Sequence, residues 1–247
     1  MRVDVLLGET PVASAEVADR VVVVIDVLRA ATTAAVALSN GARAMVPCET
    51  VELAAQQAKA MDQDSVRLGG ERHMVRIPGF DFGNSPLEYT PQRVRGRTIV
   101  FTTTNGTVAL VAAQRARECF FAAFVNVSAT LHALQAVSNG AMDIVVACAG
   151  TDRQVSLEDV VCAGRIVRGL LAAYPEATCG DGARVAELIE RPYQDSLDGL
   201  ILHATHASSL RDAGFEDDVA CCFAIDTVPA AVSFRERQLR LFTTVAT

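Results

Sequence analysis

The amino-acid sequence predicts an α/β fold, a three-layer α/β/α sandwich around a mixed, largely parallel central sheet. Continuous apolar runs, such as VVVVI at 21–25 and IVVA at 144–147, favour strands that are covered on both faces. Over the first 175 residues these runs alternate with helix-like segments, the order expected of parallel strands joined by helices. Apolar residues make up 51% of the 247 residues and tryptophan is absent, a composition that suits helices packed closely on a sheet.

The sequence then predicts each element in order. The expected strands are 3–7, 21–26, 43–46, 66–68, 98–102, 118–121 and 143–148, with shorter ones near 219–224, 231–235 and 239–243. The expected helices are 30–39, 50–61, 106–116, 127–138, 157–173, 181–190 and 196–212. The late return to short strands predicts that the sheet is mixed rather than purely parallel.

Residues 69–97 are the one long irregular stretch, rich in glycine, proline and charge. Long loops in compact domains are commonly functional, and Phe80, Phe82, Leu87 and Tyr89 indicate an ordered one. We therefore expect a single domain, 1–247, with an ordered active-site loop at 69–97.

Composition excludes several classes of protein. Seven scattered cysteines without a C-x-x-C pair predict free thiols, and a net charge of −7 with dispersed arginines disfavours nucleic-acid binding. No membrane-length apolar stretch and no signal peptide are visible, so we expect a cytoplasmic protein with no membrane partner. A homo-oligomer remains open. No G-x-S-x-G, Walker A or G-x-G-x-x-G motif occurs, which disfavours serine hydrolases, P-loop NTPases and classical dinucleotide enzymes.

Polar residues follow three of the expected strands. Asp26 ends VVVVID, three residues before Arg29, where open α/β sheets gather their ligands. Asp26 is either a metal ligand or a phosphoryl-accepting nucleophile, or else it caps a helix or pairs with Arg29. Cys148 ends another strand as either a thiolate nucleophile or a buried structural thiol.

The third strand runs through TIVFTTTNGT at 98–107 into a helix-like stretch. A helix N-terminus offers unpaired N–H groups and partial positive charge to a phosphate. Thr103, Asn105, Gly106 and Thr107 are therefore candidate substrate-binding residues. Capping of the helix, or a hairpin turn at Asn105-Gly106, is the structural alternative.

Two further segments carry candidate residues. Glu71 could bind Mg²⁺ and Arg72 could clamp a phosphate, or the two form a surface ion pair. Asn84 and Ser85, before Pro86, offer polar groups to a substrate or serve an ordinary turn.

Ser156 and the two acids that follow it match a capping box before an apolar helix. Either Glu158 or Asp159 could still bind a metal. His203 and His206 have i, i+3 spacing, but no H-E-x-x-H pattern accompanies them, so metal binding by this pair is disfavoured.

Taken together, these segments resemble the 2-phosphosulfolactate phosphatase family of coenzyme M biosynthesis. The matching blocks, in order, are VVIDVLRAATTAAVAL, LGGER, PGFDFGNSPLEY, TIVFTTTNGT, CAGT with SLEDVVCAG, and GFEDDVACC with VP. The resemblance implies a Mg²⁺-dependent acid phosphatase with an α/β/α sandwich. It also implies one site lined by Asp26, Arg29, Glu71, Arg72, Asn84, Thr103, Asn105 and Asp159.

We therefore expect a Mg²⁺-dependent phosphomonoesterase that converts a small 2-phosphorylated acid, 2-phospho-3-sulfolactate in the family, to 3-sulfolactate and phosphate. Asp26, Glu71 and Asp159 are the expected metal ligands, and Asp26, Arg29 and Cys148 are the expected catalytic residues. Asp26 is the favoured nucleophile, because a carboxylate is ionised at low pH; the Cys148 thiolate and metal-activated water are the alternatives. The rival function is a non-catalytic protein that senses a phosphorylated or sulfonated metabolite.

Overall fold

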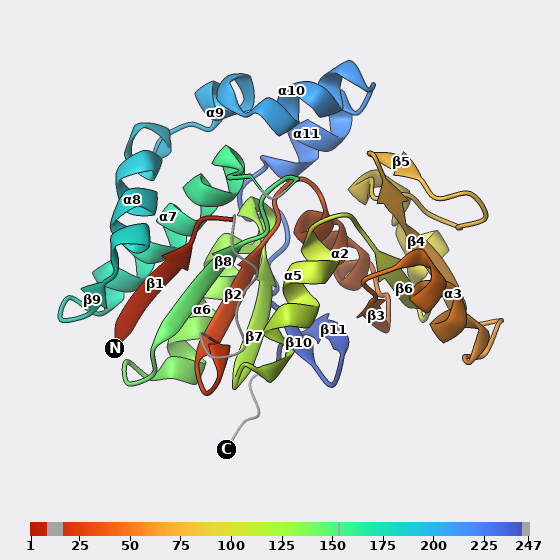
Figure 1. Cartoon of the computed structure of the whole chain (residues 1–247), viewed down its shortest axis with the longest axis horizontal. Helices are drawn as coiled ribbons and strands as arrows, with labels where there is room; N and C mark the ends of the chain where they lie inside the picture. The colour runs from red at the N-terminus through yellow and green to blue at the C-terminus, as the bar shows by residue number, and fades with distance from the viewer. Residues whose placement is uncertain (9–16, 153, 244–247) are drawn as a thin grey trace.

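The computed structural model describes residues 1–8, 17–152 and 154–243. Within them one sheet has the strand order β5-β4-β6-β3-β11-β10-β7-β2-β8-β1-β9 (Figure 1). The strands are β1 (Arg2–Leu6), β2 (Val21–Ile25), β3 (Ala44–Pro47), β4 (Val66–Arg72), β5 (Val75–Arg76), β6 (Thr98–Thr102), β7 (Glu118–Ala122), β8 (Ile144–Cys148), β9 (Thr178–Cys179), β10 (Val232–Arg235) and β11 (Gln238–Leu241).

Helices connect most of these strands. They are α2 (Ala30–Ser39), α3 (Val51–Lys59), α4 (Pro91–Val94), α5 (Gly106–Ala112), α6 (Val127–Ser138), α7 (Leu157–Ala173), α8 (Asp181–Glu190), α9 (Asp198–His203), α10 (Thr205–Asp212) and α11 (Glu216–Cys222). Short 3₁₀ turns are η1 (Pro86–Glu88), η2 (Ala113–Arg115), η3 (Phe124–Asn126) and η4 (Arg191–Tyr193). None of the helices in the described ranges is long and apolar enough to cross a membrane.

The sheet is mixed and largely parallel, as the sequence predicts. Strands β3, β6 and β4 pair in parallel, and so do β7, β2, β8, β1 and β9. The antiparallel hairpin β10–β11 lies between the two blocks and pairs antiparallel with β7 and with β3. Three successive antiparallel pairings therefore give the two parallel blocks opposite directions along the sheet.

The twist of the sheet brings the two blocks back toward each other. Neighbouring strands rotate by roughly 20–25°, so the five steps from β2 to β6 accumulate on the order of 100°. A twist of this size turns β6 well away from an antiparallel orientation relative to β2. Their carboxyl ends can then converge, and the contacts described below show that the loops after β2 and β6 do meet.

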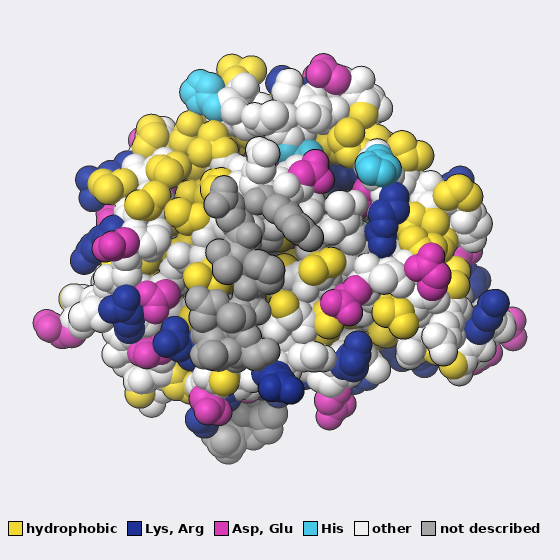
Figure 2. Space-filling model, viewed as in Figure 1, with side chains coloured by type: hydrophobic (Ala, Val, Ile, Leu, Met, Phe, Trp, Pro, Cys, Tyr) yellow, Lys and Arg dark blue, Asp and Glu magenta, His cyan; other side chains and the backbone are white. Residues whose placement is uncertain are grey.

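Helices cover the sheet on both faces, which confirms the three-layer arrangement. All five residues of β2, of β6 and of β8 are buried, which requires cover on each side. One helix group joins α6, α7 and α8, and a second joins α2 and α5. Members of both groups pack against β2. On the face seen in Figure 2, basic and acidic side chains are interspersed.

Two element predictions are wrong. Residues 219–224 are not a strand but belong mainly to α11, whose first turn carries Glu216, Asp217 and Asp218, a composition that favours a helix N-terminus. The expected helix 196–212 is divided at Ala204, whose extended backbone separates α9 from α10. A short apolar run such as VACCFA fits either a strand or a buried helix, which explains the first error.

The segment 69–97 contains the end of β4, β5, η1 and α4 rather than irregular chain alone. Phe80, Phe82 and Tyr89 are buried, whereas Leu87 is half exposed. The rings of Phe82 and Tyr89 stack with centroids 4.7 Å apart, and the Tyr89 hydroxyl donates to the Gly83 carbonyl at 2.7 Å. All seven cysteines of the chain are free thiols, as expected.

The packing of α7 on α8 yields a test of the fold. Gly164 of α7 lies so close to α8 that a methyl group there would overlap the Ala186 carbonyl and come within 2.6 Å of the Glu190 Cβ. Gly164→Ala should lower the free energy of unfolding by about 2 kcal/mol or more, because the obstacle includes backbone.

Gly199→Ala is the matched control, since a methyl group there meets only Tyr193 at 3.7 Å. It should change stability by less than about 1 kcal/mol. Urea denaturation measures both variants. Equal stabilities would contradict the close packing of α7 on α8.

Candidate active site

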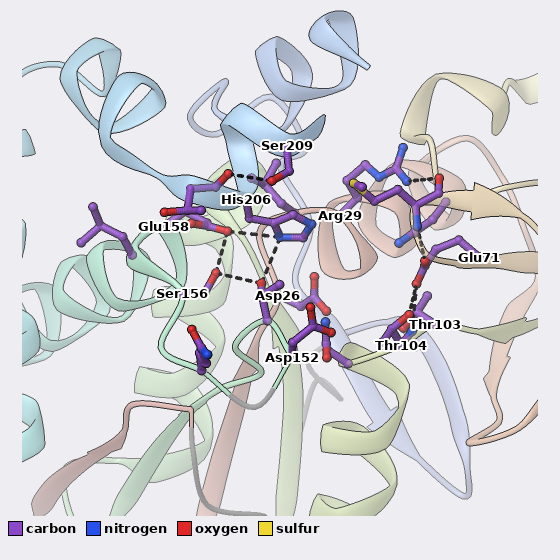
Figure 3. Close-up of a pocket in the computed structure, with 18 of the residues that line it drawn as sticks. Asp26, Arg29, Glu71, Thr103, Thr104, Asp152, Ser156, Glu158, His206 and Ser209 are labelled. Carbon is purple, nitrogen blue, oxygen red and sulfur yellow. Dashed lines mark hydrogen bonds and ion pairs between the residues drawn. The ribbon is translucent and has the colours of Figure 1, made fainter. Parts of the chain in front are cut away.

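A cavity of about 600 Å³ lies where the loops after β2, β4, β6 and β8 meet the first turns of α7 and α10. Figure 3 shows its arrangement. Glu158, Ser156 and His206 stand on one side, Glu71, Thr103 and Thr104 on the other, and Asp26 and Asp152 between them. The cavity therefore collects polar side chains from both parallel blocks of the sheet.

Asp26 follows β2 and is 6% exposed. Its Oδ1 accepts the Ala30 N–H at 3.0 Å, so one oxygen supports the start of α2 as the capping alternative requires. No described residue donates a hydrogen bond to Oδ2, which faces Gly106 so closely that a methyl group at Gly106 would overlap it. One oxygen of this carboxylate therefore supports the start of α2, and the other is left without a hydrogen bond from a described residue.

Burial, reinforced by the charges of Glu71 and Glu158, raises the pKa of Asp26 from 3.8 to about 6. The Ala30 N–H and the charge of His206 act in the opposite direction. The expectation that Asp26 is fully ionised at low pH is therefore wrong for the protein alone. A cation beside Asp26 would favour the charged form.

Arg29 lines the cavity, but its guanidinium binds other groups of the protein. It donates to the Asp218 carboxylate at 2.6 Å and to the Met74 carbonyl at 3.0 Å, and it lies 4.3 Å from the centroid of the Phe215 ring. Its ion-pair partner is thus Asp218 and not Asp26. The sequence reasoning named the GFEDDVACC block but did not single out Asp218.

The residues after β6 form a helix start and not a hairpin, as predicted. The Thr107 N–H donates to Thr103 Oγ1 at 3.2 Å, and the Thr107 hydroxyl donates to the Thr103 carbonyl at 3.0 Å. Thr103, Thr104 and Asn105 line the cavity, whereas Gly106 and Thr107 lie behind it. Two of the four predicted phosphate-binding residues of this segment therefore serve the cap and the close packing on Asp26.

Glu71 lines the cavity and Arg72 does not. Glu71 Oε1 accepts the N–H and the hydroxyl of Thr104, each at 2.9 Å, and Oε2 accepts the Met74 N–H at 2.9 Å. Arg72 donates to the Glu71 carbonyl at 2.7 Å and to Thr102 Oγ1 at 2.9 Å. The prediction that Arg72 clamps the phosphate is not supported, because its guanidinium braces β4 against β6.

Asn84 and Ser85 also differ in whether they line the cavity. Asn84 lines the cavity, and its buried Oδ1 has no hydrogen-bond partner among the described residues. Ser85 lies outside the cavity and donates to Asp218 at 2.6 Å. Asn84 is therefore available to a bound molecule, and Ser85 helps to hold the partner of Arg29.

Asp159, a predicted metal ligand, does not line the cavity. Its oxygens accept the Val27 N–H at 2.9 Å and the Gly150 N–H at 3.1 Å, which ties the loop after β2 to the loop after β8. Burial, with the charges of Glu158 and Asp26, raises its pKa well above the usual range. The capping box is not formed either, since Ser156 makes no side-chain cap hydrogen bond.

Cys148 is buried at the end of β8 and does not line the cavity. Burial, reinforced by the nearby Asp159, raises the pKa of its thiol well above the usual value. A thiolate nucleophile needs the opposite environment, one that is exposed and electropositive. The catalytic role predicted for Cys148 is therefore not supported.

His206 is a cavity residue that the sequence reasoning set aside. Its Nδ1 lies 3.1 Å from Thr151 Oγ1 and 3.6 Å from Glu158 Oε1, and the Ser156 hydroxyl donates to Glu158 Oε1 at 2.6 Å. The available signal was the CAGT block followed by SLEDVVCAG, which carries all of these partners of His206. The sequence reasoning considered His203 and His206 as a metal-binding pair and disfavoured that role.

The predicted three-carboxylate metal site is not assembled. Within 1–8, 17–152 and 154–243, no group of three or more His, Cys, Asp or Glu side chains could hold a metal ion. Mg²⁺ needs less, because it commonly uses one or two carboxylates together with water and substrate phosphate. Asp26 and Glu71 both line the cavity, and their oxygens are of the kind that this smaller requirement asks for.

Comparison with known proteins gives a consistent result. The family model described as 2-phosphosulpholactate phosphatase matches residues 8–237. A protein of Symbiobacterium thermophilum is 42% identical over 92% of this chain and 96% of its own length. A protein of Thermotoga maritima is 41% identical over 87% of this chain and 90% of its own length. A protein of Clostridium botulinum is 36% identical over 93% of this chain and 96% of its own length. Each carries the name probable 2-phosphosulfolactate phosphatase.

The burial of Asp26 predicts a dependence of stability on pH. Below pH 3.8 the residue is protonated in the folded and the unfolded chain alike. As the pH rises from 3.8 to about 6, the unfolded chain loses this proton first, so the folded state becomes relatively less stable, by on the order of 3 kcal/mol above that window. Asp26→Asn, without added metal, should therefore be more stable than the wild type at pH 8, and the difference should shrink toward pH 4.

Urea denaturation at several pH values in EDTA measures this difference. Asp212→Asn, at an exposed aspartate that ends α10, is the control and should show no such trend. A constant difference between Asp26→Asn and the wild type from pH 4 to pH 8 would contradict the raised pKa.

Proposed function

The chain belongs to the 2-phosphosulpholactate phosphatase family, and on that premise we propose that it is a phosphoric monoester hydrolase acting on a small 2-phosphorylated acid. The name shared by its relatives supports 2-phospho-3-sulfolactate as the substrate, with 3-sulfolactate and phosphate as products. The observation that carries the proposal is that Asp26, whose Oδ2 accepts no hydrogen bond from a described residue, lines the cavity together with Thr103 and Asn105.

The cavity walls offer groups that suit a polyanionic substrate. Asn105 and Asn84 bring side-chain amides to the cavity, and the N–H groups of an amide can donate to phosphate oxygens. Arg29 contributes a guanidinium, although its charge is offset by Asp218. These groups would orient the phosphoryl group and the acid that carries it.

A divalent cation is part of the proposal because four carboxyl groups line the cavity and Arg29 is the guanidinium among its described residues. Asp26, Glu71, Asp152 and Glu158 line it, and Arg29 is already paired. A phosphate dianion would be repelled by this set of charges. Asp26 and Glu71 would hold Mg²⁺, which when bound supplies positive charge to the transferring phosphoryl group.

In the proposed reaction, Asp26 Oδ2 attacks the phosphorus atom and the bond from phosphorus to the substrate oxygen breaks. The Ala30 N–H fixes the carboxylate through Oδ1, so that Oδ2 keeps its direction toward the cavity. Water then hydrolyses the aspartyl-phosphate and releases phosphate. The partial burial of the cavity limits competing hydration of the nucleophile.

Phosphate release tests the function. We expect the protein to hydrolyse 2-phosphorylated acids, and 2-phospho-3-sulfolactate best, with activity lost in EDTA and restored by Mg²⁺. The matched control is 3-phosphoglycerate, whose phosphate is on a different carbon. Undiminished phosphate release in EDTA would contradict the proposed requirement for Mg²⁺. Tight binding of the substrate without phosphate release would instead support a sensing protein.

Trapping the covalent intermediate tests the role of Asp26. Acid quenching during the first turnover of substrate labelled in the phosphoryl group should leave label on the peptide that contains Asp26, and Asp26→Asn should leave none. Cys148→Ser should be labelled like the wild type, because Cys148 is buried outside the cavity. Label on the Cys148 peptide, or none on any peptide, would overturn this assignment.

A further inference from the structure

Among the residues that the structure describes, the groups that hold His206 contact one of its two ring nitrogens. Nδ1 lies 3.1 Å from Thr151 Oγ1 and 3.6 Å from Glu158 Oε1. In Figure 3 the dashed contacts of His206 converge on this nitrogen from Glu158 and the loop that follows β8. Thr151 lies on that loop, Glu158 lies in the first turn of α7, and His206 lies in the first turn of α10. Three separate segments therefore fix the orientation of one imidazole.

Glu158 has no structural task that would explain its burial. Its side chain is 1% exposed, and it occupies the second position of α7, where a capping box with Ser156 would not use it. Its Oε1 accepts the Ser156 hydroxyl at 2.6 Å and faces His206. Burying a carboxylate costs free energy unless it is hydrogen-bonded or paired, and an imidazolium at His206 supplies the pairing charge.

The contacts on Nδ1 leave Nε2 for the cavity. The side chain of His206 is 16% exposed, and it lines the same cavity as Asp26. A carboxylate behind one ring nitrogen fixes the tautomer and stabilises the protonated ring, so the other nitrogen can give and take a proton. Figure 3 places this imidazole across the cavity from Thr103 and Thr104, with Asp26 between them.

We propose that His206 is the general acid of the reaction, and that Glu158 and Thr151 are its positioning residues. This inference rests on the proposed phosphatase function. When the bond from phosphorus to the substrate oxygen breaks, the electron pair stays on that oxygen, which takes the proton from His206 Nε2. An alkoxide leaving group needs such a proton, since it is strongly basic.

The second half of the reaction restores the acid. Neutral Nε2 takes a proton from the water that attacks the aspartyl-phosphate, a new bond forms from the water oxygen to phosphorus, and the bond from Asp26 Oδ2 to phosphorus breaks. The net change is phosphate ester plus water to alcohol plus phosphate. No oxidant, reductant or further reactant is required.

Other charged groups share the cavity with His206. Glu158 faces it from α7, Asp26 and Arg29 come from the β2–α2 connection, and Glu71 and His73 come from β4 and the turn after it. The remaining titratable groups of the cavity are Asp152 and His203. Glu158 lies 3.6 Å from the ring, so its removal should alter the pH profile of the reaction most.

Leaving groups of different basicity test the role of His206. His206→Asn keeps a donor near the Nδ1 position and removes Nε2. It should lower kcat about 10²–10⁴-fold for an alkyl substrate such as 2-phospholactate, but much less for p-nitrophenyl phosphate, whose leaving group needs no proton. The fall of wild-type activity toward high pH should disappear in this variant. His132→Asn, at an exposed histidine of α6 outside the cavity, should match the wild type with both substrates.

Glu158→Gln tests whether Glu158 positions His206. It also tests the proposal if His206→Asn does not fold. Loss of the carboxylate should shift the high-pH limb of kcat to lower pH and leave p-nitrophenyl phosphate turnover within a few-fold of the wild type. Equal losses with both substrates, or an unshifted limb, would overturn the assignment while phosphatase activity stands. A wild type that releases phosphate from neither substrate would instead overturn the proposed function.

Discussion

The site depends on the close approach of Gly106 to Asp26. The hairpin β10–β11 separates the sheet into two parallel blocks, and Asp26 and Gly106 follow strands of different blocks. A methyl group at Gly106 would overlap Asp26 Oδ2 and lie 2.9 Å from the Ala30 Cβ. The absence of a side chain at this one position therefore lets the loop after β6 lie against the start of α2. Thr103 and Asn105 reach the cavity only because that contact exists.

Most of the acids near the cavity stabilise the fold. Asp159 joins the loops after β2 and β8, Glu71 joins the turn after β4 to Thr104, and Asp218 holds Arg29 together with Ser85. Each of these carboxylates accepts hydrogen bonds that connect separate segments of the chain. In the proposed reaction, Oδ2 of Asp26 and the Glu158–His206 pair would act on the substrate, and Glu71 would in addition hold the cation.

The sequence was sufficient for what local pattern determines. The continuous apolar strands and the helices 30–39, 127–138, 157–173 and 181–190 agree with the structure, because periodicity reports burial directly. It was not sufficient for the direction of a side chain at a strand end. Arg72 and Asp159 are adjacent in sequence to cavity residues, yet their hydrogen bonds turn them toward β6 and toward backbone N–H groups. The partnership of His206 with Glu158 joins residues 48 positions apart, which no motif spacing encodes.

The charges of the cavity also constrain the order of events. A dianionic phosphoryl group approaches Asp26 against the fields of Glu71 and Glu158, and in the protein alone these fields help to hold the pKa of Asp26 near 6. Protonating Asp26 would ease the repulsion but would remove the nucleophile. A cation removes the conflict, because it attracts the phosphoryl group and favours the carboxylate form at the same time. His206 lies on the far side of Asp26 from Glu71, so in the proposed reaction a proton on its ring would stabilise negative charge that develops on the leaving oxygen. The metal-binding side and the proton-donating side of the cavity would thus act on opposite ends of the bond that breaks.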